Sequence, residues 1–494
     1  MNSIEKHINP FESNSGSSRL ANLNILIPVI AFALLMTLII VKTEILGLTL
    51  CLSLFLIITL LYVIFQNPKF GIFVLIISAF VVTGAGRYVS APWGLTIDAL
   101  LVLIYIALFF KAFAQKILWN KAKSSLTLIV TIWMGYIFLQ IGNPEAQNIE
   151  AWFYAMRGVA LYQWLVIPLL FILFNKSKDL NTFFIIWGIL SVLGTLKGFQ
   201  QFHFGVDPFE QRWLNQGGAE THILFGKLRV FSFYSDAGQF GASQGQAGLV
   251  FGILALFKKG NLKLKTFFAF VALAGFFGML ISGTRGAIAV PAIGGIIFLI
   301  LKKNVKVLIL GAVFGIAVYV FFAHTFIGQG NAEIRRMRTA FDPNDASLQI
   351  RLANQNKLKG YLASRPFGGG VGATGNWGKR FTPHTFLANT ATDSWYVMIW
   401  ADTGLVGLIY YLFMIFFILI TGAYNVMYKI KDDWLKVQIS ALVCGMAGIM
   451  MASYGNGVFG QLPTGILLYV SMVFMFISPQ IDKMKQGSKQ IITQ

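Results

Sequence analysis

The residues of this chain that could do chemistry are first of all its arginines, which are separated from its lysines along the sequence. Eleven of the twelve arginines fall in one set of connections between apolar segments, while lysines cluster in the alternate connections. A guanidinium group binds phosphate oxygens through two parallel hydrogen bonds, which the ammonium group of lysine cannot reproduce. The separation favours anion binding by the arginines, with ordinary loop charge as the alternative.

Two of these arginines stand where an apolar segment begins. Arg229 precedes one such segment and has apolar neighbours on both sides, and Asp236 follows it as the expected helix cap. Arg285 lies at the tip of a predicted tight hairpin, ISGTRGAIAV, at the start of the next helix. Backbone N–H groups at a helix start also attract anions, and a charge so close to hydrocarbon is a functional candidate.

A third candidate, Arg351, lies in the long polar stretch 327–393. A helix is predicted there between Pro343 and Ser364, where Arg351 shares one face with Leu348, Leu358 and Leu362. We therefore expect Arg351 to turn toward the protein and to need an anionic partner. The glycine-rich run 365–375 that follows lacks the Gly-Lys-Ser/Thr of a phosphate loop and is interpreted as a turn that lets the backbone pack close to the site.

His384 and Asp393 are the titratable groups beside these arginines, and either could be a base that takes a proton from a hydroxyl group. The simpler interpretations are a polar surface histidine and a helix-capping aspartate. The five histidines have no paired spacing, and the sequence contains no Walker motif or nucleotide fingerprint. We therefore expect no metal ion, nucleotide or other cofactor.

The elements that must position these residues are membrane helices. Of the 494 residues, 56% are hydrophobic and 12% are charged, a composition typical of multi-span membrane proteins. The net charge of +20 is spread through the connections, so no compact basic domain exists to bind nucleic acid. About fourteen apolar segments (twelve to fourteen) are long enough to span: 24–41, 45–65, 70–84, 95–113, 125–142, 158–174, 181–197, 236–257, 266–282, 286–301, 305–326, 394–421, 437–453 and 463–480.

Lysine-rich connections mark the cytoplasmic side, and both termini belong to that side. This topology predicts a cytoplasmic N-terminal tail (1–23), eleven spans (24–326), a large outer loop (327–393), three further spans (394–480) and a cytoplasmic C-terminal tail (481–494). Arg157 then falls in the outer connection 143–157.

Over about residues 225–425 the chain resembles the superfamily of O-antigen ligases and O-antigen or exopolysaccharide polymerases of the bacterial inner membrane. The resemblance rests on four motifs in this order: LRVFSFYSDAGQFG, ISGTRGA, SLQIRLANQNKLKGYLASRPFGGGVG and DSWYVMIWADTGLVGLIYYL. It implies an all-α fold similar to the multi-span lipid-linked-sugar glycosyltransferases, with a large, partly helical periplasmic loop.

The resemblance also implies a metal-independent transfer of a glycan from undecaprenyl diphosphate to a hydroxyl group. Arg229, Arg285 and Arg351 would bind the diphosphate, while Asp393 or His384 would act as the base. Trp377, Trp395 and Trp400 would suit the faces of sugar rings. Ligases of this family have a histidine where this chain has Asp393, and an acid there favours a polymerase.

The first hypothesis is therefore a polysaccharide polymerase that joins lipid-linked repeat units. The alternatives are an O-antigen ligase or protein O-oligosaccharyltransferase with the same donor, and a transporter or flippase for a lipid-linked or anionic substrate. A transporter places its charges near the bilayer midplane, whereas here they lie at outer helix ends. The expected partners are the undecaprenyl-diphosphate-linked oligosaccharide and membrane lipid, with a chain-length regulator or other envelope-assembly proteins left open.

Overall fold

A computed structural model describes residues 49, 51–114, 116–224, 226–303, 305–330, 334–335, 338 and 346–492. The chain divides into two units, Met1–Asn67 and Pro68–Gln494. Within the first unit, the described residues form an apolar helix, Cys51–Gln66. The predicted span 24–41 and the start of the long helix in the outer loop lie outside the described residues.

Eleven helical stretches of the described residues are long and apolar enough to cross a membrane. They are α2 (Pro68–Ala85), α3 (Gly94–Ala114), α4 with η2 (Ser125–Gly142), α5, η3 and α6 (Ile149–Leu173), α7 (Ser177–Phe204), α10 (Ala237–Phe257), α11 (Leu262–Ile281), η5 and α12 (Arg285–Lys302), α18 and η7 (Trp395–Lys429), α19 (Asp433–Ala452) and the Thr464–Gly487 part of α20 (Thr464–Ile492). Two shorter apolar stretches add to them, Cys51–Gln66 and Gly311–His324 of α13 (Val305–His324). The prediction of an all-α multi-span protein is confirmed, while the full count of fourteen stays a prediction.

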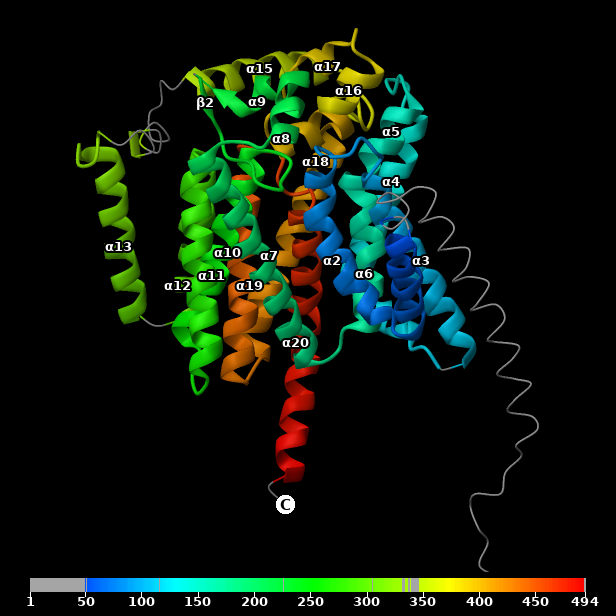
Figure 1. Ribbon diagram of the computed structural model, residues 1–494, viewed down its shortest axis with the longest axis vertical. Coiled ribbons are helices and arrows are strands. Elements are labelled where there is room, and N and C mark those ends of the chain that lie inside the picture. The colour runs from blue at the N-terminus through cyan, green and yellow to red at the C-terminus, as the bar shows by residue number, and fades with distance from the viewer. Residues whose placement is uncertain are drawn as a thin grey trace, which may run out of the picture. The chain divides into compact units, whose positions relative to one another are not determined.

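The remaining described elements are not among the candidate spans. They are η1 (Trp119–Ala122), α8 (Pro208–Trp213), η4 (Leu214–Gly218), α9 (Ala219–His222), the two-residue antiparallel strands β1 (Ile223–Leu224) and β2 (Lys227–Leu228), α15 (Ala346–Leu362), α16 (Gly375–Phe381) and α17 (Phe386–Asn389). Within the second unit, α8, α9, α15, α16 and α17 gather at one end of the long helices, and α20 runs out from the opposite end (Figure 1). That opposite end carries the lysine-rich connections, which the positive-inside rule assigns to the cytoplasm.

The largest boundary differences from the sequence prediction occur at two helices. The helix expected at 158–174 begins at Ile149, so Arg157 lies inside a membrane helix and not in a connection. The polar run 143–150 predicts a loop, but Asn148 in this run caps the helix by accepting a hydrogen bond from the N–H group of Ala151. At the other end of the chain, α20 continues as a helix to Ile492, beyond the expected membrane boundary at 480.

Helices α10, α19 and α20 form the centre of the second unit, because 83%, 89% and 83% of their spanning windows are buried. The first part of helix α10, residues 237–248, contains mostly small residues and can therefore approach its neighbours closely. The closest approach is to α11, where a Cβ atom added to Gly275 would lie 2.6 Å from the backbone nitrogen of Gly248. The contact therefore requires glycine at position 275.

A buried arginine holds the segment between α7 and α10 against the helices. Arg87 follows α2, and its guanidinium group donates to the carbonyl oxygens of Ser232, at 2.6 Å, and Tyr234. The same group lies 4.8 Å from the ring centre of Trp213 and 4.3 Å from that of Phe231. Burial lowers the pKa of Arg87 to about 10, so the side chain stays charged at neutral pH. This arginine is structural.

The close contact between α10 and α11 generates a stability prediction. Gly275→Ala places a methyl group against the backbone of α10 and should lower the free energy of unfolding by about 1–3 kcal/mol. The matched control is Gly295→Ala in α12, where an added Cβ meets nothing within 4 Å. Thermal unfolding of purified protein in detergent measures both variants, and equal midpoints would contradict the packing described here.

Candidate functional site

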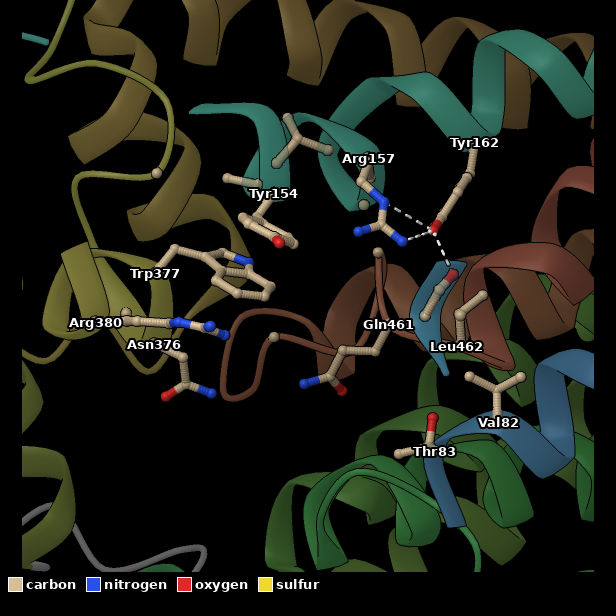
Figure 2. Close-up of a pocket in the computed structure, with 18 of the residues that line it drawn as sticks. Val82, Thr83, Tyr154, Arg157, Tyr162, Asn376, Trp377, Arg380, Gln461 and Leu462 are labelled. Atoms are coloured by element: carbon tan, nitrogen blue, oxygen red, sulfur yellow. Dashed lines mark hydrogen bonds between the residues drawn. The ribbon is translucent and has the colours of Figure 1, made fainter. Parts of the chain in front are cut away.

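A cavity of about 1070 Å³ is lined by residues of α16 and of the ends of several long helices. Its walls come from five parts of the chain: the end of α2 with the turn to α3, the α5–α6 segment, the glycine-rich loop with α16, the start of α18, and the turn between α19 and α20. Lining side chains include Tyr154, Arg157, Trp377 and Arg380 (Figure 2). Asp393 lines the cavity as well. The cavity therefore combines two arginines, aromatic rings and two carboxylates, since Asp402 also lines it.

Arg157 is the most deeply placed of these charges, with a side chain that is 9% exposed. It projects from η3 (Arg157–Leu161), a π-helical turn between α5 and α6, and such turns are frequent at functional sites. Its Nη2 atom lies 2.5 Å from Oδ2 of Asp98, and its Nε and Nη2 atoms donate to the Tyr162 hydroxyl group at 3.2 and 3.0 Å (Figure 2). Asp98 balances the buried charge and fixes the direction of the guanidinium group.

An aromatic stack stands beside Arg157. The ring of Tyr154 lies 4.8 Å from that of Trp377 at an angle of 18°, and 5.6 Å from that of Phe381 at 14°. Arg380 extends along this stack, with its guanidinium carbon 5.8 Å from the Tyr154 ring centre (Figure 2). Arg380 is exposed and makes no ion pair with a carboxylate in the described part of the chain. Its charge is available to an anion that enters the cavity.

The buried carboxylate of Asp402 determines where α16 stands. Its Oδ2 and Oδ1 atoms accept hydrogen bonds from the backbone N–H groups of Gly372, at 3.0 Å, and Thr374, at 3.2 Å. Helix α18 is interrupted at Gly404, which has a φ of +70°, and an added Cβ there would lie 2.0 Å from the carbonyl oxygen of Pro366. The glycine-rich loop is thus a close-packed turn that leads directly into α16, as its composition predicts.

The structure brings two of the predicted residues together at the cavity. Asp393 lines the cavity, and its Oδ2 atom lies 3.7 Å from Nε of Arg351. Asp393 has a φ of +46°, a conformation that non-glycine residues rarely adopt and that is common at functional sites. His384, the other candidate base, is exposed in the turn between α16 and α17 and does not line the cavity.

The helix that carries Arg351 forms as predicted, but its arginine is less buried than expected. Leu358 and Leu362 of α15 pack with Leu387 and with Val397 of α18 in one buried cluster. This cluster engages only the C-terminal half of α15, so Arg351 in the first half remains 37% exposed. The expectation that Arg351 is buried was wrong, while the anionic partner it required is present as Asp393.

Arg229 and Arg285 form a separate group beside the N-terminus of α10 and do not line the cavity. Nη2 of Arg229 donates to the hydroxyl group of Thr284 at 3.2 Å, and Thr284 in turn donates to the carbonyl oxygen of Ala237 at 2.9 Å. Arg285 begins η5 immediately after the predicted hairpin turn. Asp236 caps α10 as expected, by accepting from the N–H group of Gln239.

This second group is linked to the cavity through the start of α10. Nε2 of Gln461, a residue of the cavity wall, donates to Oδ2 of Asp236 at 3.3 Å. Gln239 donates to the carbonyl oxygen of Leu462, which lines the cavity as well, at 2.8 Å. The start of α10 therefore connects the group of Arg229 and Arg285 to the wall of the cavity that contains Arg157 and Arg380.

Sequence reasoning missed Arg157, Asp98, Tyr154 and Arg380 as site residues. A signal existed for the first two, because a charged residue within an apolar helix is a functional candidate by default. No local signal identifies Tyr154 or Arg380, since their meeting depends on how α5 and α16 pack. In the described residues, no three side chains of His, Cys, Asp or Glu converge as metal ligands would.

These features define a multi-span membrane protein with an arginine-bearing cavity at one end of its helices. Residues 268–412 match the family described as O-antigen ligase, and this stretch is an O-antigen ligase family domain. The domain was recognised in the sequence, and the match confirms it. No curated protein matches the chain. The family is one of bacterial inner-membrane proteins and suggests an enzyme that ligates or polymerises lipid-linked glycans. The matched region contains Arg285, Arg351 and Asp393, while Arg157 precedes it.

The hydrogen bonds between Asp402 and the glycine-rich loop generate a prediction about the cavity wall. Asp402→Asn turns an amide N–H group toward one of the two backbone donors, and a lost bond of this kind costs about 1–3 kcal/mol. We expect a lower unfolding midpoint and faster tryptic cleavage after Lys379 and Arg380 in native protein. The control is Glu220→Gln, which changes an exposed carboxylate in the short helix α9. Equal cleavage rates in both variants would show that the Asp402 hydrogen bonds do not hold the loop and α16 in place.

Proposed function

We propose that this chain is a polysaccharide polymerase of the bacterial inner membrane, with about fourteen spans and both termini in the cytoplasm. It transfers a glycan from undecaprenyl diphosphate to a hydroxyl group of a second lipid-linked repeat unit at the periplasmic face. The observation that carries the proposal is the cavity, where Arg157, Arg380, Asp393 and the Tyr154–Trp377 stack meet within and beside the family domain.

The cavity residues can serve each part of this reaction. The acceptor oxygen forms a bond to the anomeric carbon, and the bond from that carbon to the diphosphate breaks, so the electron pair leaves with the diphosphate. Guanidinium groups stabilise this growing negative charge. The acceptor hydroxyl group gives its proton to a base, for which we assign Asp393 because it lines the cavity and His384 does not. The stacked aromatic rings suit the apolar faces of sugars.

The presence of two arginine groups supports a polymerase over a ligase. A polymerase of this kind holds two lipid diphosphates, one on the donor and one on the acceptor, whereas a ligase holds only the donor. Arg157 and Arg380 stand in the cavity, and Arg229 with Arg285 stands beyond Gln461 and Asp236. We propose that each group binds one diphosphate, with Arg351 next to the base.

The proposal is tested with purified protein in nanodiscs and a synthetic undecaprenyl-diphosphate repeat unit, without added nucleotide or metal. A ladder of longer lipid-linked products is the expected result. The family's description favours the ligase as the second candidate. Product that forms only after addition of lipid A core or an acceptor protein would establish a ligase or an O-oligosaccharyltransferase instead. Substrate that crosses the bilayer without any product would establish a transporter.

The assignment of the base predicts different outcomes at two positions. Asp393→Asn should lower the rate at least about 100-fold, since general-base catalysis contributes typically 10²–10⁴-fold. Asparagine tolerates the positive φ of this position, so the backbone should remain in place. His384→Gln should keep nearly the full rate in the same ladder assay. A large loss in the histidine variant with activity retained in the asparagine variant would reverse the assignment.

The diphosphate sites predict that arginine cannot be replaced by lysine. Arg157→Lys and Arg285→Lys each exchange a bidentate fork for a point charge and should lower the rate at least about tenfold. Arg212→Lys is the matched control, because Arg212 is exposed on α8 outside both groups. Nanodisc activity at saturating substrate, with size-exclusion profiles to check folding, measures the three variants. Unchanged turnover in Arg285→Lys would remove that residue from the proposal.

A further inference from the structure

A second pocket lies at the opposite end of the helices, away from α15, α16 and α17. It has a volume of about 430 Å³ and is formed by the ends of α10 and α12, by η7 (Asn425–Lys429) and by the start of α19. Five lysines and a single carboxylate line it: Lys258, Lys259, Lys302, Lys303, Lys436 and Asp433. Such a charge imbalance in one small pocket is unfavourable unless an anion is bound there.

Aromatic rings hold three of these lysines in place. The Nζ atom of Lys302 lies 3.6 Å from the ring centre of Phe257, and that of Lys258 lies 4.2 Å from the ring centre of Trp434. Lys303 is positioned in the same way over Tyr428, also at 4.2 Å. None of the five lysines makes an ion pair with a carboxylate in the described ranges. The ammonium groups are thus ordered by packing and not by neutralising partners.

The backbone of Lys303 gives independent support for a site. Lys303 caps the C-terminus of α12 with a φ of +49°, in the left-handed conformation that usually requires glycine or asparagine. A lysine at this position is sterically unfavourable, and strain of this kind is found where a side chain is needed for function. Here the strained residue is one of the lysines that line the pocket.

We propose that this lysine pocket binds the phosphate-bearing headgroup of an anionic phospholipid from the cytoplasmic leaflet. Basic pockets between helix ends on the cytoplasmic side are suited to such headgroups. Apart from Ser440, the rest of the wall is apolar and includes Phe257, Leu301, Val426 and Val437. This apolar surface matches the glycerol and first acyl carbons of a lipid better than a free anion. The proposal does not depend on the reaction assigned to the outer cavity.

A lipid bound there joins the inner ends of three helices that pack closely. A Cβ atom on Gly294 of α12 would lie 2.7 Å from the carbonyl oxygen of Cys444 in α19, and α10 contacts both helices. Helix α12 follows directly from η5, which carries Arg285 at the other end. The lipid therefore stabilises the helices next to the group of Arg229 and Arg285.

The test compares lipid binding to the full-length protein by native mass spectrometry, with phosphatidylglycerol and phosphatidylcholine as the probes. The variant Lys258→Gln/Lys302→Gln keeps the side-chain stems and removes two charges from the pocket. The control Lys263→Gln/Lys265→Gln removes two exposed lysines at the start of α11, near Lys258 in the chain but outside the pocket. Inorganic phosphate in large excess serves as a competitor.

Wild-type protein should bind phosphatidylglycerol in preference to phosphatidylcholine. The pocket variant should bind phosphatidylglycerol about thirtyfold more weakly, from the typical contribution of two lysines at a membrane surface, while the control should bind as the wild type does. Equal loss in both variants would show a diffuse charge effect and overturn the proposal. Displacement of the lipid by inorganic phosphate would establish a free-anion site and overturn the lipid assignment.

Discussion

The hydrogen bonds between Asp402 and the glycine-rich loop are the constraint on which the outer cavity depends. A carboxylate within a membrane helix is unfavourable without partners, and here its partners are the backbone N–H groups of Gly372 and Thr374. The interruption of α18 at Gly404 lets the loop approach closely enough to form these bonds. Because α16 begins directly after the loop, the same bonds position Trp377 and Arg380.

The arginines of the outer side perform different tasks, which their common location in the sequence conceals. Arg87 is held between aromatic rings and fixes the segment 205–235. Arg365 pairs with Glu145, at 3.0 Å, and fixes the long loop to the connection before α5. Arg157 and Arg380 line the cavity, and Arg229 and Arg285 belong to the group beside the start of α10. Ordinary structural use therefore explains part of the separation of arginine from lysine, and anion binding is proposed for the rest.

Much of the architecture was predictable because it depends on local patterns. Apolar runs and lysine positions identify the spans, and the hairpin before Arg285, the cap at Asp236 and the apolar face of α15 follow from short-range sequence rules. The pairing of Arg351 with Asp393 was half predicted, since a carboxylate partner was required but not named. The cavity itself was not predictable. It forms because a Cβ-free residue, Gly372, packs against the backbone of Ala151 and brings α16 to α5. That contact joins residues far apart in the chain and leaves no local pattern.

The central claim is that the cavity between α5, α16 and α18 holds the glycan at the reacting bond. The most direct test is photoaffinity labelling in nanodiscs with an undecaprenyl-diphosphate glycan that carries a photoreactive group on its first sugar, followed by peptide mapping. Labels on the peptides that contain Tyr154–Tyr162 and Gly372–Arg380 are the predicted result. Labels confined to other helices, with these two segments unmodified, would contradict the account.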